Sequence, residues 1–239
     1  FNFSNYREKV LHMKRSNTMN IRRLTMIGLF TALAYVVMVL IHFPVPPMLT
    51  LDLKDTVITL CGLCFGPLAA VFAGIVVPFL ELITVSGTGG YGFIMNALAT
   101  LSFSVTVSLI YRFRKNMFGA VLGLVSGVFA MTAVMLLFNL VITPWYLHIS
   151  VAEVRQMIPT LLLPFNLVKA VLNAALVMLL YKPVSSALQR MGFLPRSEHS
   201  YRLDWRTVTA IAISLVLIVA AFVVVFQVLG GSFTFGWDA

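Results

Sequence analysis

Apolar runs long enough to cross a lipid bilayer dominate this chain. Hydrophobic residues make up 60% of its 239 positions and charged residues only 10%. The hydrocarbon core of a bilayer needs about 20 consecutive apolar residues when a chain crosses it as a helix. Because a soluble domain of this size does not need so much apolar surface, we expect an all-α integral membrane protein.

The apolar runs divide the chain into a membrane domain and an additional helix. Six runs within residues 21–183 predict a six-helix bundle. The second is too short for an upright helical span, so a re-entrant segment is the alternative. A charge-free seventh run predicts a further C-terminal transmembrane helix. The expected helices cover residues 22–42, 56–65, 68–84, 93–111, 117–142, 160–181 and 208–229, and the regions flanking the membrane domain are 1–20, 184–206 and 207–239.

The positions of the basic residues predict the orientation. The net charge of +9 could indicate a nucleic-acid-binding protein. Fourteen of the 17 basic residues, however, lie in three segments, 7–23, 112–115 and 182–206. Such clusters mark the cytoplasmic side of a membrane protein, so we expect a cytoplasmic N-terminus, a cytoplasmic linker over 184–206 and an outer C-terminal tail. The first run follows a basic leader and is expected to be retained, and because the chain starts at Phe1 we expect residues upstream of it.

Two of the expected outer loops are rich in proline or in glycine. Residues 43–55 contain three prolines, which bar a helix and predict an extended outer loop, with Asp55 capping the following short helix. Residues 86–92 are rich in glycine. They lack the strand and the Lys-Ser/Thr of a phosphate-binding loop and match a potassium filter only loosely. We expect a mobile outer loop that could close over a ligand.

Small residues within the apolar runs predict close packing. Cys61 and Cys64 have the spacing of a redox pair or half of a zinc site, but their apolar setting favours small buried side chains and no metal. Gly119, Gly123 and Gly127 recur every four residues and favour a close helix–helix contact. Gly28 and Ala32 form a similar pair in the first helix, which could serve the bundle itself or a partner.

The sixth expected helix carries an unusual polar face. Asn166, Lys169 and Asn173 follow the i, i+3, i+7 spacing and share one side of a helix. A lysine in the middle of a membrane helix costs roughly 2.5–3.5 kcal/mol on insertion scales unless it finds a partner or water. This face therefore predicts a polar ligand site, and a snorkelling lysine or a helix–helix contact is the alternative.

With the predicted topology, further polar residues fall in the outer half of their helices or in the outer loops. We expect a pocket open to the outside, in which amides and a lysine bind a flat heteroaromatic ligand. Four aromatic side chains, Phe138, Trp145, Tyr146 and Phe165, could stack on that ligand. The candidate binding residues are Leu49, Thr50, Leu51, Glu81, Asn96, Asn139, Asn166, Lys169 and Asn173.

Four motifs resemble the substrate-binding (S) components of energy-coupling-factor vitamin transporters, and the riboflavin-specific type most closely. The similarity spans roughly residues 24–183. The motifs are Gly28-Leu29-Phe30-Thr31-Ala32-Leu33-Ala34, Leu51-Asp52-x-x-Asp55, Phe65-Gly66-Pro67-Leu68-Ala69 and Pro164-Phe165-Asn166-Leu167-Val168-Lys169-Ala170. Two features depart from the family pattern: Val77-Pro78 stands where the riboflavin type often has Lys-Asn, and the seventh apolar run lies outside the usual six helices.

This resemblance implies a multi-pass subunit of an ABC importer in the bacterial cell membrane. It would capture riboflavin from outside as its transported ligand, without a cofactor, and would deliver it through a membrane-embedded coupling (T) protein driven by two cytoplasmic ATPases. By similarity, Asn166 and Lys169 would bind the ring system of the vitamin, and Gly28 and Ala32 would face the coupling protein.

Other functions stay open at this stage. An S component for folate or another vitamin would share the same architecture. A membrane enzyme could use Lys169 or Glu81 as an acid or base, but no second ionisable group lies at a helical spacing from Lys169. A channel would need the glycine-rich loop to line a pore. We expect a transporter subunit that is not an enzyme, in which the partners hydrolyse ATP.

Overall fold

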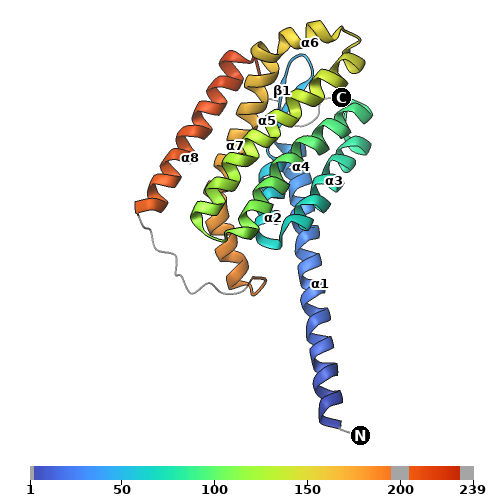
Figure 1. Cartoon of the computed structure of the whole chain (residues 1–239), viewed down its shortest axis with the longest axis vertical. Coiled ribbons are helices and arrows are strands. Elements are labelled where there is room, and N and C mark those ends of the chain that lie inside the picture. The colour runs from blue at the N-terminus through green and yellow to red at the C-terminus, as the bar shows by residue number, and fades with distance from the viewer. Residues whose placement is uncertain (1–2, 195–204, 232–239) are drawn as a thin grey trace.

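The protein forms a helical bundle that holds a small β-hairpin at one end (Figure 1). The structure is a computed structural model that describes residues 3–194 and 205–231. Its long helices are α1 (Phe3–Leu40), α3 (Pro67–Thr84), α4 (Gly89–Phe113), α5 (Met117–Leu147), α7 (Leu163–Arg190) and α8 (Trp205–Val223). The shorter elements are β1 (His42–Val45), β2 (Leu49–Asp52), α2 (Lys54–Phe65), α6 (Val151–Met157) and the π-helical segments η1 (Ile158–Leu162) and η2 (Val224–Val228).

The predicted architecture of six bundle helices and one further apolar helix is confirmed. Six helices among the described residues are long and apolar enough to cross a membrane, and the C-terminal one covers residues Val208–Val228. The short helix α2 is the remaining member of the bundle. Residues 3–20 continue α1 without a break, and its first half extends beyond the bundle (Figure 1).

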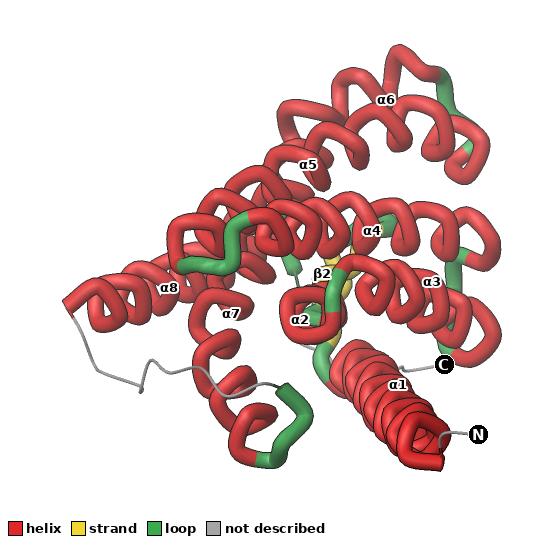
Figure 2. Tube along the Cα trace, turned by 60° about the horizontal axis from the view of Figure 1, so that its bottom comes forward, coloured by secondary structure: helices red, strands yellow, loops and turns green. Residues whose placement is uncertain are grey.

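Helix α2 lies at the centre of the bundle. It is enclosed by α1, α3, α4 and α7 (Figure 2), and 11 of its 12 residues are buried. At 1.5 Å per residue it is only about 18 Å long, so it fills part of the bundle's depth. The antiparallel hairpin of β1 and β2 fills the rest, with Pro44 opposite Thr50. The predicted extended loop is therefore a hairpin folded into the bundle, and we call its side of the molecule the hairpin end.

The glycines of α5 allow the predicted close contact, and the partner is α4. A Cβ atom added at Gly123 would lie 3.0 Å from the carbonyl oxygen of Val107. One added at Gly127 would lie 2.6 Å from Cγ2 of the same valine. Cys61 is buried in the core and Cys64 is half-buried, and both thiols are free.

Several local predictions were wrong. Gly89–Gly92 form the first turn of α4 instead of a loop, and the chain enters that turn at Gly89 with a positive φ of 58°, which glycine adopts without strain. Asp55 does not cap α2: Leu53 occupies the cap position and makes no side-chain cap bond. The expected linker also starts late, because α7 continues past Pro183 to Arg190.

The opposite side of the molecule, which we call the basic end, is where α2, α4 and α7 finish. It holds a second cavity of about 810 Å³ whose lining includes Arg22, Arg23, Arg112 and Lys115. Arg23 donates a hydrogen bond to the carbonyl oxygen of Phe65, one of the unpaired carbonyls at the end of α2. The basic clusters around 22 and 112 therefore meet at one end of the bundle.

Candidate functional site

A cavity of about 490 Å³ opens at the hairpin end. This volume lies within the range of roughly 300–1,000 Å³ that small-molecule sites occupy. The hairpin forms one wall over Pro44–Thr50, and the opposite walls come from α4, α5 and α7. The turn between α3 and α4, Ser86–Thr88, completes the rim. Segments far apart in the sequence therefore surround one space.

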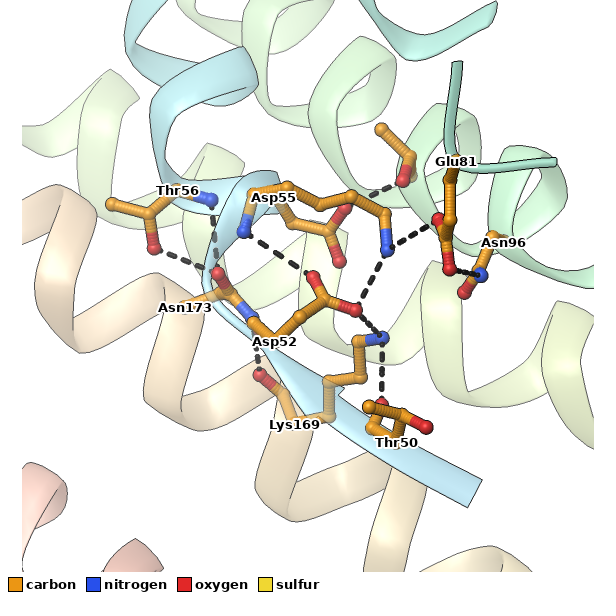
Figure 3. A network of polar contacts seen from close by, with 10 residues as sticks. Thr50, Asp52, Asp55, Thr56, Glu81, Asn96, Lys169 and Asn173 are labelled. Carbon is orange, nitrogen blue, oxygen red and sulfur yellow. Dashed lines mark hydrogen bonds and ion pairs between the residues drawn. The ribbon is translucent and has the colours of Figure 1, made fainter. Parts of the chain in front are cut away.

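Two lysines share one buried carboxylate beside this cavity. Oδ2 of Asp52, at the end of β2, lies 2.7 Å from Nζ of Lys54 and 2.9 Å from Nζ of Lys169. Figure 3 shows Asp52 between the helix that carries Lys169 and the start of α2. All three side chains are at most 4% exposed. Because a buried charge is tolerated only when it is paired, this triad fixes the hairpin to α2 and α7.

The charge network extends from Lys54 toward the α3–α4 side. Nζ of Lys54 lies 3.4 Å from Oε2 of Glu81, and Oε1 of Glu81 accepts a hydrogen bond of 2.7 Å from Asn96. Lys169 also donates a hydrogen bond of 3.4 Å to the carbonyl oxygen of Thr50 (Figure 3). Lys169, Glu81, Asn96 and Thr50 all line the cavity, whereas Lys54 stands behind them. A ligand would thus meet one cation, one carboxylate and an amide of this network.

A second set of hydrogen bonds holds α2 in place without reaching the cavity. Oδ1 of Asn173 accepts hydrogen bonds from the backbone N–H of Thr56, at 2.9 Å, and from its hydroxyl, at 2.7 Å. Thr100 donates a hydrogen bond of 2.5 Å to Oδ1 of Asp55. The first turn of α2 is thereby anchored to α7 on one side and to α4 on the other. Asn173 is fully buried and is not in the cavity lining.

Two further amides face the cavity with part of their hydrogen-bonding capacity still available. The amide nitrogen of Asn166 donates to the carbonyl oxygen of Leu162 at 2.7 Å. Among the described residues none donates to its Oδ1. The amide nitrogen of Asn139 donates to the carbonyl of Met135, and its Oδ1 accepts from Thr143 at 2.8 Å. Each amide nitrogen has two hydrogens, so each can still donate one hydrogen bond to a ligand.

The structure brings seven of the nine predicted binding residues to this cavity. Leu51 and Asn173 do not line it: Leu51 is fully buried on the side of the hairpin away from the cavity, and Asn173 holds α2. The residues that line it are Leu49, Thr50, Glu81, Asn96, Asn139, Asn166 and Lys169.

Only part of the predicted aromatic set reaches the cavity. Phe165 and Tyr146 line it, and Tyr146 contacts the ring of Tyr91, 5.8 Å away between centroids. Trp145 is 71% exposed, and neither it nor Phe138 lies in the lining. Both are on the outward face of α5, because a helix turns by about 100° per residue and a neighbour of a lining residue points elsewhere.

The sequence did not indicate Lys54 or Tyr91 as site residues, and it indicated Asp52 only as part of an outer loop and of one motif. Lys54 was assigned to an outer loop, yet it is 0% exposed. A run with three charged residues, Asp52-Leu53-Lys54-Asp55, immediately before an apolar helix is the signal that could have indicated buried charge. Nothing local shows that Asp52 pairs with Lys169, which lies 117 residues away. No group of metal-ligating side chains occurs in the described part of the chain.

The paired small residues of α1 lie away from the site and away from the bundle. Gly28 and Ala32 are exposed, and a Cβ atom added at Gly28 would have nothing within 4 Å. The opposite face of α1, including Phe30 and Ala34, enters the core instead. Packing of the Gly28–Ala32 face inside the protein's own bundle, the alternative considered from the sequence, is therefore excluded.

The fold and the cavity define a multi-pass membrane protein with a cavity of small-molecule size at one end. The chain belongs to the family of ECF transporter substrate-specific components, whose family model matches residues 22–181. A solved structure of the S component of a bacterial ECF transporter shares the fold, with a TM-score of 0.62 and 29% identity, and the match covers 72% of this chain and 99% of that one.

Two named relatives match most of their own length. The riboflavin transporter RibU of Staphylococcus aureus (strain TCH60) is 28% identical over 187 residues, which cover 74% of this chain and 98% of the relative. The riboflavin transporter FmnP of Bacillus subtilis (strain 168) is 25% identical over 175 residues, which cover 68% of this chain and 92% of the relative.

Proposed function

We propose that this protein is the riboflavin-binding subunit of an energy-coupling-factor importer. The observation that carries the proposal is the convergence of Asn139, Asn166 and Lys169 on one cavity at the hairpin end. The ring system of a flavin has an edge where carbonyl oxygens flank an N–H group. The spare amide donors, the free Oδ1 of Asn166 and the ammonium of Lys169 complement that edge. Both named relatives are riboflavin transporters, which supports the same ligand.

The orientation follows from the distribution of charge. The basic end carries Arg22, Arg23, Arg112 and Lys115, and by the positive-inside rule this charge supports a cytoplasmic location for that end. The hairpin end and its cavity then face outward, and the protein captures the vitamin from outside the cell. The N-terminus is cytoplasmic in this arrangement.

A partner completes the transport cycle. The proposed site would bind its ligand between helices, and uptake against a gradient needs an energy source as well. Membership in the ECF family supports a membrane-embedded coupling protein with two ATPases as the partner. The exposed Gly28–Ala32 face of α1 offers that protein a place to approach closely, because small residues let helix backbones meet.

Ligand titration of the purified, detergent-solubilised protein tests the proposal. Riboflavin fluorescence should be quenched on binding, and protein purified from riboflavin-containing medium should carry the visible absorbance of a flavin. Folate, at the same concentration, should neither bind nor compete. Binding of folate with no response to riboflavin would make this an S component for another vitamin. Absence of any flavin or folate binding by folded protein would overturn the assignment of the cavity.

A further inference from the structure

Helix α8 is the element that the family does not explain. The family match ends at residue 181, before α8 begins at Trp205. Within the span Val208–Val228 the buried residues are Ser214, Ala221 and Val225, so most of the span faces away from the bundle. Buried residues concentrate at the end of α8 and in the following segment η2, where Ala221, Val225 and the adjoining Leu229 are each at most 7% exposed. Figure 1 shows α8 along the flank of α7, rising toward the hairpin end.

The buried end of α8 meets the hairpin through a cluster of three phenylalanines. Phe222 and Phe226 stack on each other one turn apart, with ring centroids 6.0 Å apart and planes 11° apart. Phe43 of β1 presents an edge to both, at 5.5 Å and 79° to Phe222 and at 5.6 Å and 89° to Phe226. Edge-to-face contacts of this kind are favourable beyond the area they bury.

Further contacts continue along β1 and β2. Val45 and Leu51 belong to the same buried cluster as Val225 and Leu229. A Cβ atom added at Gly231, just after η2, would lie 3.4 Å from Cγ2 of Val45. Both α8 and the residues that follow it therefore lie against the hairpin.

The hairpin is held from two sides as a result. On one side Pro44 and Thr50 line the cavity, and Asp52 and the carbonyl of Thr50 bind Lys169. On the other side Phe43 packs on α8. The polar contacts depend on the same lysine that faces the cavity, whereas the aromatic contacts do not involve the cavity at all. An element that fixes the hairpin independently of the ligand site can set how easily this wall moves.

We infer that α8 and the segment η2 that continues it position the hairpin against the ligand cavity through Phe222 of α8 and Phe226 of η2, and that they thereby slow release of the bound ligand. The second half of this inference rests on the proposed function, because it needs a ligand in the cavity. Phe222 and Phe226 act through Phe43, so they are positioning residues that do not touch the ligand. Affinity differences between related complexes arise mostly from the dissociation rate, so that rate is the quantity to measure.

Two readouts on the full chain, purified and folded, test the inference. The variant is Phe222→Ala/Phe226→Ala. The matched control is Val216→Ala/Val219→Ala on the same helix, at positions that are 68% and 62% exposed. Stopped-flow measurement of riboflavin release should give a dissociation rate about threefold to tenfold faster for the phenylalanine variant. Amide hydrogen exchange of the ligand-free protein over residues 42–52 should also be faster, and the control should match the unmodified chain in both measurements.

A double-mutant cycle separates positioning from a general loss of stability. Phe43→Ala should speed release by a similar factor, and combining it with the α8 variant should add little, because both changes break one contact. The replacements Phe222→Leu and Phe226→Leu, which keep bulk, should restore most of the slow release. Unchanged release and unchanged hairpin exchange in the alanine variant, with riboflavin still bound, would overturn the inference and leave the proposed function intact. If the unmodified chain binds no flavin, the proposed function fails, and the hydrogen exchange alone decides whether α8 positions the hairpin.

Discussion

At the hairpin end of the bundle, two lysines share the carboxylate of Asp52 beside a cavity of about 490 Å³. Halfway along the same helices the interior is the opposite, with Ile58, Cys61, Phe103 and Val107 all 0% exposed and in one apolar cluster. The cavities at the two ends share no lining residue within the described part of the chain. The polar network therefore lies at the end where the 490 Å³ cavity opens, and the packed middle separates the two ends.

The comparison predicts that charge changes act at the hairpin end and volume changes act in the middle. Removing one partner from a buried polar network destabilises the fold, because the remaining charges are left unpaired and out of contact with water. Adding atoms to a close-packed apolar region also destabilises the fold, because the neighbouring side chains or helices must move to make room. Variants of the two kinds should therefore have separable effects on stability and on ligand binding.

The largest effect is expected for Asp52→Asn. This change removes the carboxylate that both lysines share and leaves Glu81 as the remaining ion-pair partner of Lys54. Breaking a buried ion pair costs about 3–5 kcal/mol. We expect a marked drop in the unfolding temperature and a poor yield of folded protein in detergent. Glu153→Gln is the matched control, because Glu153 caps the exposed helix α6 and its loss should leave the unfolding temperature almost unchanged. Equal unfolding temperatures for both variants would show that the network does not hold the hairpin.

The next effect is expected in the packed middle, from Gly127→Leu. The added side chain would begin 2.6 Å from Val107 and 3.1 Å from Phe103, so α4 and α5 would have to separate. Overpacking of this kind costs about 1–3 kcal/mol. The unfolding temperature should fall, while the molecules that remain folded should bind riboflavin normally. Gly28→Ala, in open space on α1, is the control and should leave the unfolding temperature unchanged. A selective loss of affinity in Gly127→Leu, with normal stability, would show that the two ends are not independent.

The sequence predicted these two regions unequally. Apolar runs indicated every long helix, and the glycine spacing of α5 indicated its close contact, because helix periodicity is a local property. The spacing of Asn166, Lys169 and Asn173 correctly indicated a polar face. It could not show that Asn173 would bind Thr56, 117 residues away, while its neighbours line the cavity. Strand pairing and ion pairs join segments that are remote in sequence, so they leave no periodic signal.

Lys54 illustrates the same limit. Lys54 follows a segment with three prolines and lies between two acidic residues, a pattern typical of a solvated loop. In the structure it is the first residue of α2, of which 11 of 12 residues are buried. Its burial depends on Asp52 and Glu81, which come from two other elements. Tertiary contacts, which the local sequence does not indicate, therefore determine that Lys54 lies in the core and not in a loop.

The two lysines at the hairpin end should have different effects, because Lys169 lines the cavity and Lys54 does not. Lys169→Met should weaken riboflavin binding about tenfold or more, because a hydrogen bond to a charged group contributes about 1.5–3 kcal/mol and each 1.4 kcal/mol is one decade. Lys54→Met should weaken binding less, because Lys54 does not line the cavity. It should lower the unfolding temperature more, because it contacts both Asp52 and Glu81. Because Lys169 pairs with Asp52, Lys169→Met should also cause a modest loss of folded protein. The reverse order of the two variants in affinity would place the ligand on the Lys54 side of the network.

The smallest effect on the isolated protein is expected from the α1 surface, which belongs to neither region. Gly28→Leu and Ala32→Leu add bulk where the structure has open space, so the unfolding temperature and the riboflavin affinity of the purified subunit should stay within error of the unmodified chain. Uptake into cells and co-purification with the coupling protein should fall, because bulk on a small-residue face keeps two helices apart. Leu33→Ala is the matched control on the same exposed helix surface, since it removes bulk instead of adding it, and it should leave uptake and assembly unchanged. Normal uptake by both leucine variants would assign the Gly28–Ala32 face to lipid, and loss of riboflavin affinity in the isolated subunit would mean that α1 communicates with the cavity through its buried face, where Phe30 and Ala34 join the core.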